Sequence, residues 1–471
     1  MSAGADRLTP LDVSFLYLES PTTAMHVGSV ALFELPAQES FDYEALCELV
    51  AQRISLQPRY RQKVRWVPGH LANPVWVDDE NFDIAYHVRR SALPRPGSED
   101  QLRELVGRVQ SRSLDRDRPL WELYLVEGLA GATTGSERFA IITKVHHAVA
   151  GDVGIDITSL LLDTTADPPP VVDDGWTPTR EPSPLELLAA AIADNLRQPT
   201  QVLDTLRSEV TDVKAAAGRA FGAAGGVFSA VRKSLRPAPA SPLNVTVGEQ
   251  RRFGMAATDL EDYRRVRKAH GGTVNDVVLA TVAGALRIWL LTRGESVTGA
   301  TTLRALVPVS VRDAHADGTP GGRLSALFVD LPVGEGSPVV RLHRVSYATK
   351  AHQESGQTMS ADAIRSLSGF APPTIHSAAA RLGARMTRRL FNVVVSNVPG
   401  PQQPMYAGGA QLLECYPVVP LGQDQALTIG LTSYNGRVFY GLNVDRDAMP
   451  DVDVLAQCIQ ESLAELVASV R

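Results

Sequence analysis

Apolar and polar positions fall into two stretches of the chain, and each stretch alternates between strand-like and helix-like patterns. Strand-like runs are apolar and rich in β-branched residues, whereas helix-like runs carry apolar residues three and four positions apart. In the first stretch the predicted strands are residues 27–35, 120–126 and 139–145, and the predicted helices are residues 43–54 and 99–114. In the second the predicted helices are residues 259–270 and 276–291, and the predicted strands are residues 304–311, 326–333 and 391–396. This alternation predicts a mixed α/β protein with two halves.

The strongest local signal is a hairpin near the end of the chain. Residues 427–432 and 438–444 alternate apolar and polar side chains, and Asn435-Gly436 stands between them. An Asn-Gly pair accommodates the positive φ angles of a two-residue hairpin turn. We therefore predict that these two runs are neighbouring antiparallel strands.

Two proline-rich segments, residues 167–184 and 236–242, lie between the halves. Proline at this density breaks regular structure, so we expect loops or linkers there. The predicted domains are a first half with residues 1–166, a linker region with residues 167–242, and a second half with residues 243–471.

Between the proline segments, residues 185–231 are rich in Ala and Leu at helical spacing and are followed by Arg232, Lys233 and Arg236. A basic amphipathic end of this kind could lie on anionic lipid. Packing against its own protein, with the charges exposed, is the more frequent arrangement and is the one we favour.

Composition and charge exclude several classes of protein. Of the 471 residues, 44% are hydrophobic and 21% are charged, and the net charge is −6, so there is no basic field for nucleic acid. The three cysteines Cys47, Cys415 and Cys458 are far apart and form no C-x-x-C, which indicates a reducing compartment. No signal-peptide core and no uninterrupted apolar stretch long enough for a bilayer is evident. We expect a cytoplasmic protein, with peripheral contact to a membrane or lipid droplet.

The candidate chemistry is concentrated at His146-His147. An apolar run leads into this pair, and Gly151-Asp152 follows as a predicted turn before a further helix. If the strand continues through the pair, His147 shares a face with Val145 and His146 points the other way, because side chains alternate along a strand. Imidazole titrates near neutrality, so one of these rings could accept a proton from a hydroxyl or thiol.

The same histidines could instead have a structural or a metal-binding role. Both could belong to a core or turn, which is the usual role of a lone histidine. They could also bind a metal, but adjacent histidines point apart, and no cysteine cluster or second histidine pair supports such a site. The position of the pair at a strand end, with Asp152 nearby, favours catalysis over both.

Several short segments, spread over most of the chain, match one family when they are taken in order. They are Pro10-Leu-Asp12 with Phe15-Leu16, Arg118-Pro-Leu-Trp-Glu122, His146-His147, Pro242-Leu-Asn244 with Arg251-Arg252, Thr273-Val-Asn-Asp276, Val307-Pro-Val-Ser-Val-Arg312, Ser396-Asn-Val-Pro-Gly-Pro401 and Gly430-Leu-Thr-Ser-Tyr-Asn-Gly436. Each alone is a weak signal. With all of these segments in this order, the sequence resembles the bacterial wax ester synthase/diacylglycerol acyltransferases. That family belongs to the wider group of CoA-dependent acyltransferases that carry an HHxxxDG motif.

The resemblance implies an α/β (α+β) fold with two similar chloramphenicol-acetyltransferase-like halves. In this family mixed sheets are backed by helices, and the interface of the halves forms the active-site tunnel. The implied activity is acyl-CoA-dependent transfer of a long-chain fatty acyl group to diacylglycerol, with long-chain alcohols as a second class of acceptor. Acyl-CoA is a substrate, and no cofactor is implied.

The resemblance also implies roles for particular residues. His147, the second histidine of the motif, would be the general base that takes the acceptor's hydroxyl proton and then returns it to the CoA thiolate, without a covalent acyl-enzyme. The oxyanion donor would be a turn amide or Asn275. Asn275 and Asp276 could equally be a helix cap, because an apolar helix follows them.

Two further residues are weaker candidates. Arg312 ends a predicted strand and could pair with the carboxylate of the motif, although an arginine in that position is more often solvated. Asn397 lies in Ser396-Asn-Val-Pro-Gly-Pro401, which is either a rigid structural turn or a wall of the tunnel.

The sequence departs from the family at one point of the motif. The family places Asp four residues after the second histidine and then Gly, whereas here Gly151 precedes Asp152. The family's Asp is structural, and Asp152 could instead cap the following helix. We therefore expect weaker catalysis than in relatives with the usual order.

Two other functions compete with this one. The first is a condensation domain of peptide synthesis, which normally sits beside a carrier domain, and this chain has no remaining length for one. The second is a catalytically inactive homologue that binds acyl chains or lipid surfaces.

Overall fold

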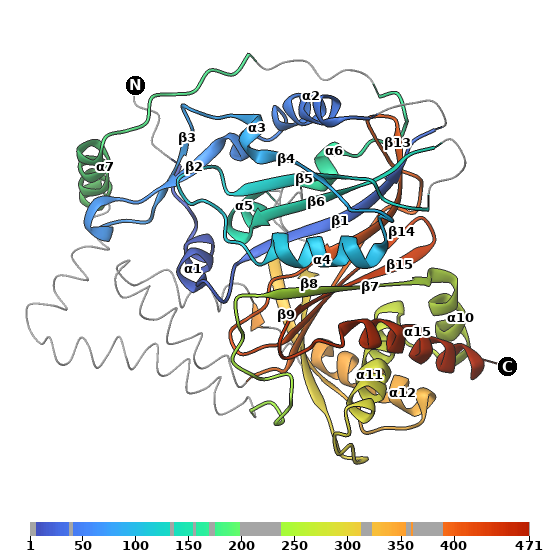
Figure 1. The fold of residues 1–471 in the computed structure, drawn as a ribbon. Helices are drawn as coiled ribbons and strands as arrows, with labels where there is room; N and C mark the ends of the chain where they lie inside the picture. The colour runs from blue at the N-terminus through green and yellow to red at the C-terminus, as the bar shows by residue number, and fades with distance from the viewer. Residues whose placement is uncertain are drawn as a thin grey trace, which may run out of the picture.

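Two central β-sheets organise the protein, one in each half (Figure 1). The computed structural model describes residues 6–36, 41–131, 136–153, 157–168, 175–197, 237–311, 323–354, 359–360 and 390–470. Within these residues the first sheet has the strand order β12-β13-β1-β6-β5-β4, and the second has the order β10-β9-β8-β11-β14-β15-β7. Both sheets mix parallel and antiparallel pairs. This arrangement confirms the predicted α/β class.

The first sheet contains the strand that leads to the histidine pair. Its strands are β1 (His26–Glu34), β4 (Val88–Ala92), β5 (Trp121–Glu127), β6 (Arg138–His146), β12 (Tyr406–Ala407) and β13 (Ala410–Val418). Strand β6 lies between β1 and β5 and is antiparallel to both. Strand β13 pairs with β1, so a segment from late in the chain completes the first sheet.

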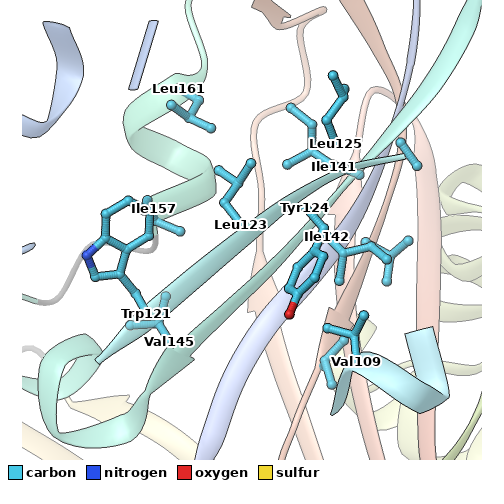
Figure 2. Packing of buried hydrophobic residues seen from close by; sticks show 14 of the residues in the cluster. Val109, Trp121, Leu123, Tyr124, Leu125, Ile141, Ile142, Val145, Ile157 and Leu161 are labelled. Carbon is cyan, nitrogen blue, oxygen red and sulfur yellow. The ribbon is translucent and has the colours of Figure 1, made fainter. Parts of the chain in front are cut away.

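Apolar side chains of β5 and β6 form the core beside the candidate site (Figure 2). Trp121 faces Val145 across the two strands, and Leu125 faces Ile141. All four side chains are buried, and Ile157 from helix α6 (Ile157–Leu161) packs in the same cluster. Close packing on this side gives the end of β6 a rigid support.

The second sheet includes the predicted hairpin. Its strands are β7 (Arg251–Asp259), β8 (Leu303–Val311), β9 (Arg323–Leu331), β10 (Met359–Ser360), β11 (Val393–Pro399), β14 (Leu427–Tyr434) and β15 (Arg437–Asp445). Strands β14 and β15 are antiparallel neighbours, and the residues between them have positive φ angles, 44° at Asn435 and 80° at Gly436. The hairpin prediction is confirmed.

Helices α10 (Leu260–His270), α11 (Val274–Thr292), α12 (Pro338–Glu354) and α15 (Val452–Ala468) gather beside the second sheet (Figure 1). Helix α11 packs against α12 and α15 and is the core helix of this layer. It is 19 residues long with a mean hydropathy of 1.6, so by length and composition it could cross a bilayer, although Asp276 and Arg287 interrupt its apolar sequence. In the structure 72% of its apolar window is buried, because the helix lies inside the protein.

The remaining described elements belong mainly to the first half. They are α1 (Pro10–Leu18), α2 (Tyr43–Ile54), the 3-10 turns at Pro58–Arg61 and Pro68–His70, β2 (Gln62–Arg65), β3 (Val75–Asp78), α3 (Ile84–His87), α4 (Glu99–Gln110), α5 (His147–Val153) and α7 (Pro184–Arg197). Helix α4 packs on β7 of the second half, and a Cβ atom at Gly107 would lie 2.7 Å from the carbonyl oxygen of Arg251. Glycine therefore permits the close approach of the two halves at this seam.

Most predicted elements occur within a few residues of their expected limits, and helix α4 is the main exception. It ends at Gln110 rather than at residue 114, because the Ser111 hydroxyl donates to the Gly107 carbonyl and closes the last turn. In the predicted linker region, residues 167–168 and 175–183 are irregular and α7 follows. The rest of the helical prediction, with Arg232, Lys233 and Arg236, lies outside the described residues.

Candidate active site

The histidine pair spans the junction of a strand and a helix. Strand β6 ends at His146, and His147 is the first residue of α5. The His146 amide donates to the Leu120 carbonyl at 2.9 Å, and the His147 amide donates to the Met25 carbonyl at 2.8 Å. The strand therefore ends between the two histidines, as a strand-end position for the pair requires, and the condition that it continues through both of them is not met. The two rings nevertheless face different surroundings, because the backbone changes direction between them.

His147 lies against an aromatic ring and is largely enclosed. Its imidazole stacks on Phe15, with ring centroids 4.0 Å apart and planes 20° from parallel. Burial lowers the pKa of His147, and a hydrogen bond with its own backbone opposes this only in part. Nδ1, the ring nitrogen nearer the backbone, is buried and has no hydrogen-bond partner of good geometry in the part of the chain that the structure describes. A neutral ring with its proton on Nδ1 leaves Nε2 free to accept a proton.

Helix α1 presents one face to both histidines. The helix begins cleanly because the Thr9 side chain accepts from the Asp12 amide and donates to the Asp12 carboxylate, and Pro10 occupies the first turn. Phe15 and Glu19 are four residues apart, so they share a face of the helix. Phe15 stacks on His147, while Glu19 reaches His146, with 3.7 Å between Oε2 and Nε2.

Glu19 is the centre of a buried polar cluster behind the pair. Its carboxylate lies 3.2 Å from Nε2 of His26 and 2.6 Å from a guanidinium nitrogen of Arg116. Burial raises the pKa of Glu19, but the close contact with His26 and the hydrogen bonds from Arg116 outweigh burial and lower it to about 2. Glu19 is therefore ionised at neutral pH and holds these side chains in place.

His146 is unsuited to act as the base. Its side chain is 1% exposed, and burial lowers its pKa to about 3, although the Glu19 charge opposes the shift. Nδ1 accepts a hydrogen bond from the Ala148 amide at 3.1 Å, which places the proton of the neutral ring on Nε2, toward Glu19. The scaffold thus holds Nδ1, and Nε2 is buried beside Glu19 without a hydrogen bond to any described residue, where an acceptor substrate cannot reach it.

The buried histidines make the fold sensitive to acid. Folding lowers the pKa of His146 from 6.5 to about 3, so its contribution to stability is present above pH 6.5 and is lost as the pH falls toward 3. We expect the free energy of unfolding to fall in this range and the His146→Asn variant, which keeps an acceptor for the Ala148 amide, to fall less steeply. The difference should approach about 1.4 kcal/mol per pH unit.

Urea unfolding of the wild type and the variant at pH 7, 6 and 5 measures this slope. His26, His87 and His147 also have lowered pKa values, so the variant should retain part of the acid sensitivity. Identical slopes in the two proteins would contradict the placement of a neutral His146 in the core.

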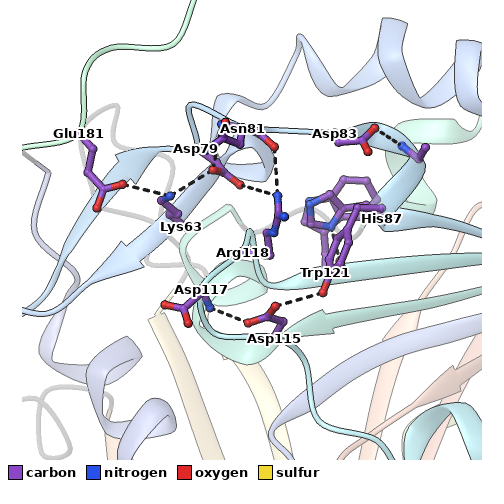
Figure 3. Close-up of polar contacts among 12 residues, drawn as sticks. Lys63, Asp79, Asn81, Asp83, His87, Asp115, Asp117, Arg118, Trp121 and Glu181 are labelled. Carbon is purple, nitrogen blue, oxygen red and sulfur yellow. Dashed lines mark hydrogen bonds and ion pairs between the residues drawn. The ribbon is translucent and has the colours of Figure 1, made fainter.

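The segment Arg118-Pro-Leu-Trp-Glu122 supplies the carbonyl that holds His146, and it is itself anchored (Figure 3). The Trp121 indole donates to the Tyr60 carbonyl at 2.7 Å and stacks on His87, with ring centroids 4.5 Å apart. Arg118 donates to the Asn81 carbonyl at 3.1 Å and lies 3.9 Å from the Asp79 carboxylate. These contacts give the segment a positioning role that motif recognition alone did not reveal.

Two predicted residues from distant parts of the sequence meet at the start of α11. The Asn397 side-chain amide donates to Oδ1 of Asn275 at 3.1 Å. Asp276 belongs to a capping box with Thr273 and also accepts from the Thr349 hydroxyl at 2.6 Å. Asp276 thus has the role of a helix cap. Among the described residues, no hydrogen bond or ion pair joins this group to the histidines.

The inverted pair lies in a helix rather than in the predicted turn. Gly151 and Asp152 are both within α5, so Asp152 is inside a helix and does not precede one as its N-cap. The small residues Ala148 and Ala150 favour helix at this position, and Ala148 is buried in the core. The side chain of Asp152 and the whole of Arg312 lie outside the described part of the structure.

Sequence reasoning missed Glu19, His26 and Arg116. A signal for Glu19 existed, because it lies one helical turn after Phe15, which belongs to one of the family segments. His26 and Arg116 gave no local signal. Their roles depend on contacts with Glu19 across the fold.

Comparisons with known proteins agree with this geometry. The family model described as the wax ester synthase/diacylglycerol acyltransferase catalytic domain matches residues 8–278, and the WS/DGAT C-terminal domain matches residues 321–467. A probable diacylglycerol O-acyltransferase of Mycobacterium tuberculosis is 34% identical over 466 residues, which cover 98% of this chain and 96% of that protein. A second relative from the same organism is 44% identical over 263 residues, 55% of this chain and 95% of the relative.

Solved structures extend the likeness to the fold. The wax ester synthase/diacylglycerol acyltransferase from Marinobacter aquaeolei superposes with a TM-score of 0.69 at 30% identity, covering 98% of this chain and 99% of that one. The first condensation domain of the CDA synthetase has a TM-score of 0.56 at 16% identity, covering 100% and 98%, and shares the fold alone. By sequence, by fold and by the His146-His147 junction, the chain belongs to the wax ester synthase/diacylglycerol acyltransferase family.

Proposed function

We propose that this protein is an O-acyltransferase that transfers a long-chain fatty acyl group from acyl-CoA to diacylglycerol, with His147 as the general base. The observation that carries the proposal is the setting of His147: the ring is held against Phe15, burial lowers its pKa, and its Nδ1 is buried. Such a ring is neutral at physiological pH and offers Nε2 to a substrate.

In the proposed reaction Nε2 of His147 takes the proton of the acceptor hydroxyl as the oxygen attacks the thioester carbonyl. The C–O bond forms, the C–S bond then breaks, and the CoA thiolate receives the proton from the imidazolium. No covalent acyl-enzyme and no cofactor are required. Proton transfer of this kind contributes about 10²–10⁴-fold to a rate.

The polar pair Asn275 and Asn397 supports a path for the substrate beside the second sheet. Their side chains are partly exposed and joined by one hydrogen bond, which leaves the amide of Asn275 as a donor for a developing oxyanion or for the pantetheine arm. We propose that they line the tunnel that the family implies.

Diacylglycerol is the preferred acceptor in this proposal because the M. tuberculosis relatives carry the name diacylglycerol O-acyltransferase and match most of the chain. Long-chain alcohols are a second acceptor class, since the Marinobacter relative carries both activities in its name. Both acceptors reside in lipid, so we further propose that the protein works in the cytoplasm in peripheral contact with a membrane or lipid droplet.

An assay with labelled palmitoyl-CoA tests the function directly. The purified protein is mixed with diolein in one arm and hexadecanol in the other, and the labelled triacylglycerol and wax ester are separated and counted. Formation of either ester supports transfer and rules out a protein that only binds acyl chains. Binding of palmitoyl-CoA without ester or free CoA in both arms would contradict the proposal.

The inverted pair gives a separate prediction. Adjacent positions on a helix differ by about 100° around its axis, so the order Gly151-Asp152 puts the acidic residue at a different position around α5 from the family's Asp-Gly order. We expect the swap of Gly151→Asp with Asp152→Gly to raise turnover, because a shift of about 1 Å at a reacting group can cost roughly a hundredfold in rate.

Steady-state rates of the wild type and the swapped protein, compared at equal thermal stability, measure this effect. The single change Asp152→Asn is the control, since it removes the charge and leaves the order as it is. A clear loss of turnover in the swapped protein would show that α5 has adapted to the inverted order.

A further inference from the structure

Helix α7 is held against the first half by a narrow apolar stripe. Leu187 is buried in a small cluster with two valines of β3, and Ala191, one helical turn later, is buried as well. The segment before the helix is fastened to the same strand, because the Thr179 amide donates to the Asp78 carboxylate at 3.0 Å. The helix therefore has a defined orientation on the protein.

The other face of α7 is apolar and open to solvent. Leu185, Leu188, Ala189 and Ile192 are spaced three and four residues apart, which places them on one side of a helix. Leu185 is 77% exposed and Ile192 is 49% exposed, while Ala189 is exposed and Leu188 is half-buried. The face with the more regular apolar pattern is thus the one that the described protein leaves uncovered.

A further exposed leucine lies beside the helix. The 3-10 turn Pro68–His70 at the tip of the β2–β3 hairpin contacts α7, and Leu71, which follows the turn, is 53% exposed. Figure 1 shows α7 and this tip together at one edge of the first half. Leu71, Leu185, Leu188, Ala189 and Ile192 together are called the α7 patch below.

The length and exposure of the helix limit what covers this patch. Residues Pro184–Ala193 form an apolar helix that is too short to cross a bilayer. A segment of this kind is stable in a protein core or at the boundary of water and lipid, and the exposure of Leu185 and Ile192 excludes a core for their face. Five aliphatic side chains offer on the order of a few hundred Å². A stable protein interface needs roughly 800 Å² from each partner, so a second copy of the chain is a poor occupant.

The charges beside the patch favour a lipid surface without net charge. Arg180 pairs with Glu186 at 2.6 Å, and Glu181 pairs with both Lys63 and Arg65. Acidic and basic groups thus neutralise one another where α7 begins. Anionic lipid is attracted by clusters of unpaired cations, whereas a zwitterionic surface requires none.

A series of contacts connects the patch with the candidate site. Trp66, two residues before the 3-10 turn, has its ring 5.2 Å from the ring of Tyr17 on α1. Tyr17 lies two residues after Phe15, which stacks on His147. Tryptophan and tyrosine are the side chains that prefer the boundary of water and lipid. A lipid surface at the patch would therefore lie beside the helix that contacts the proposed base.

We propose that the α7 patch docks the protein on a zwitterionic phospholipid surface that contains diacylglycerol. The inference rests on the proposed function and adds to it the place where the lipid-dissolved acceptor is met. Leu185 and Ile192 insert between the headgroups, while Leu187 and Ala191 keep α7 on the protein. An apolar face of this size gives shallow and reversible attachment.

The test is the double variant Leu185→Gln with Ile192→Gln, which leaves the buried stripe of α7 intact. In flotation with vesicles of phosphatidylcholine and diolein, we expect its apparent affinity to fall about tenfold or more, because two aliphatic anchors are lost. Turnover of diolein in the same vesicles, below saturating lipid, should fall to a similar extent. Turnover with dissolved hexanol should stay within about twofold of the wild type, since that acceptor does not require docking.

Helix α12 provides the matched control. Val340 and Tyr347 are 41% and 78% exposed and are seven residues apart, as Leu185 and Ile192 are. The double variant Val340→Gln with Tyr347→Gln should float with the vesicles like the wild type. If urea unfolding shows that the α7 double variant is unstable, the single change Leu185→Gln takes its place, because it alters the most exposed side chain of the patch.

The outcomes separate this inference from the proposed function. If the wild type forms no ester but floats with vesicles through the α7 patch, the docking surface stands and the acyltransferase proposal fails. The docking surface is overturned if the wild type does not float, if the α7 variant floats like the wild type, or if both double variants lose affinity equally. It is also overturned if only phosphatidylglycerol vesicles bind the protein, or if the α7 variant loses only a dimer in sedimentation velocity.

Discussion

Replacement of His147 by alanine should reduce acyl transfer to diacylglycerol by about 10²–10⁴-fold while the protein remains folded. The expected loss follows from the position of the ring, which stacks on Phe15 at 4.0 Å and has a pKa lowered by burial, whereas Nδ1 of His146 is held by the Ala148 amide. The side chain packs at the start of α5 and leaves the core strands untouched. Initial rates with labelled palmitoyl-CoA, together with the melting temperature, measure the two effects separately.

His343 provides the matched control for this experiment. It is an exposed histidine on α12, so His343→Ala makes the same chemical change away from the candidate site and should keep wild-type turnover. Retention of more than about a tenth of the activity in His147→Ala would exclude the general-base role, since the loss expected for a missing base is larger.

Replacement of Glu19 by alanine should damage both stability and turnover. The side chain is 6% exposed, and its carboxylate contacts His26, His146 and Arg116, so its loss leaves buried polar atoms without their partner. Each such group costs about 1–3 kcal/mol. The same change loosens α1 and the segment up to Met25, whose carbonyl holds the His147 amide, and a shift of about 1 Å there could lower the rate by roughly a hundredfold.

Two variants separate the structural effect from a loss of charge. Glu19→Gln keeps the size and an acceptor oxygen, so it should retain more stability and more turnover than Glu19→Ala. Glu48→Ala removes an exposed carboxylate on α2 and should leave both quantities unchanged. Urea unfolding and steady-state rates are the measurements. Wild-type turnover in Glu19→Ala at reduced stability would show that the cluster supports the fold and does not position His147.

A large part of the fold could be predicted from local pattern. Helix α2 has the predicted limits because four apolar residues recur at helical spacing and all four are buried. The β14–β15 hairpin formed because Asn435-Gly436 accepts the positive φ angles of the turn. These features depend on residues that are close in sequence, so a single chain contains the necessary information.

Other features depended on contacts between distant segments. Strand β13 completes the first sheet although it belongs to the second half of the chain. No feature of residues 410–418 by themselves identifies β1 as the strand with which they pair. The predicted turn after the histidines is a helix, because tertiary packing of Ala148 and Val149 outweighs the turn signal of Gly151-Asp152. The helix or turn propensity of a short segment predicts its conformation poorly where the burial of its side chains in the fold determines that conformation.

The candidate site shows the same division. By itself the sequence determined that a histidine pair follows an apolar strand and that a segment with Phe15, near the start of the chain, matches the family. Only the tertiary structure decided that Phe15 stacks on His147, that Glu19 joins His26 to His146, and that Asn397 meets Asn275. The reason is physical: alternation and helical spacing specify which face a side chain takes, whereas the partner on that face is set by how separate elements pack.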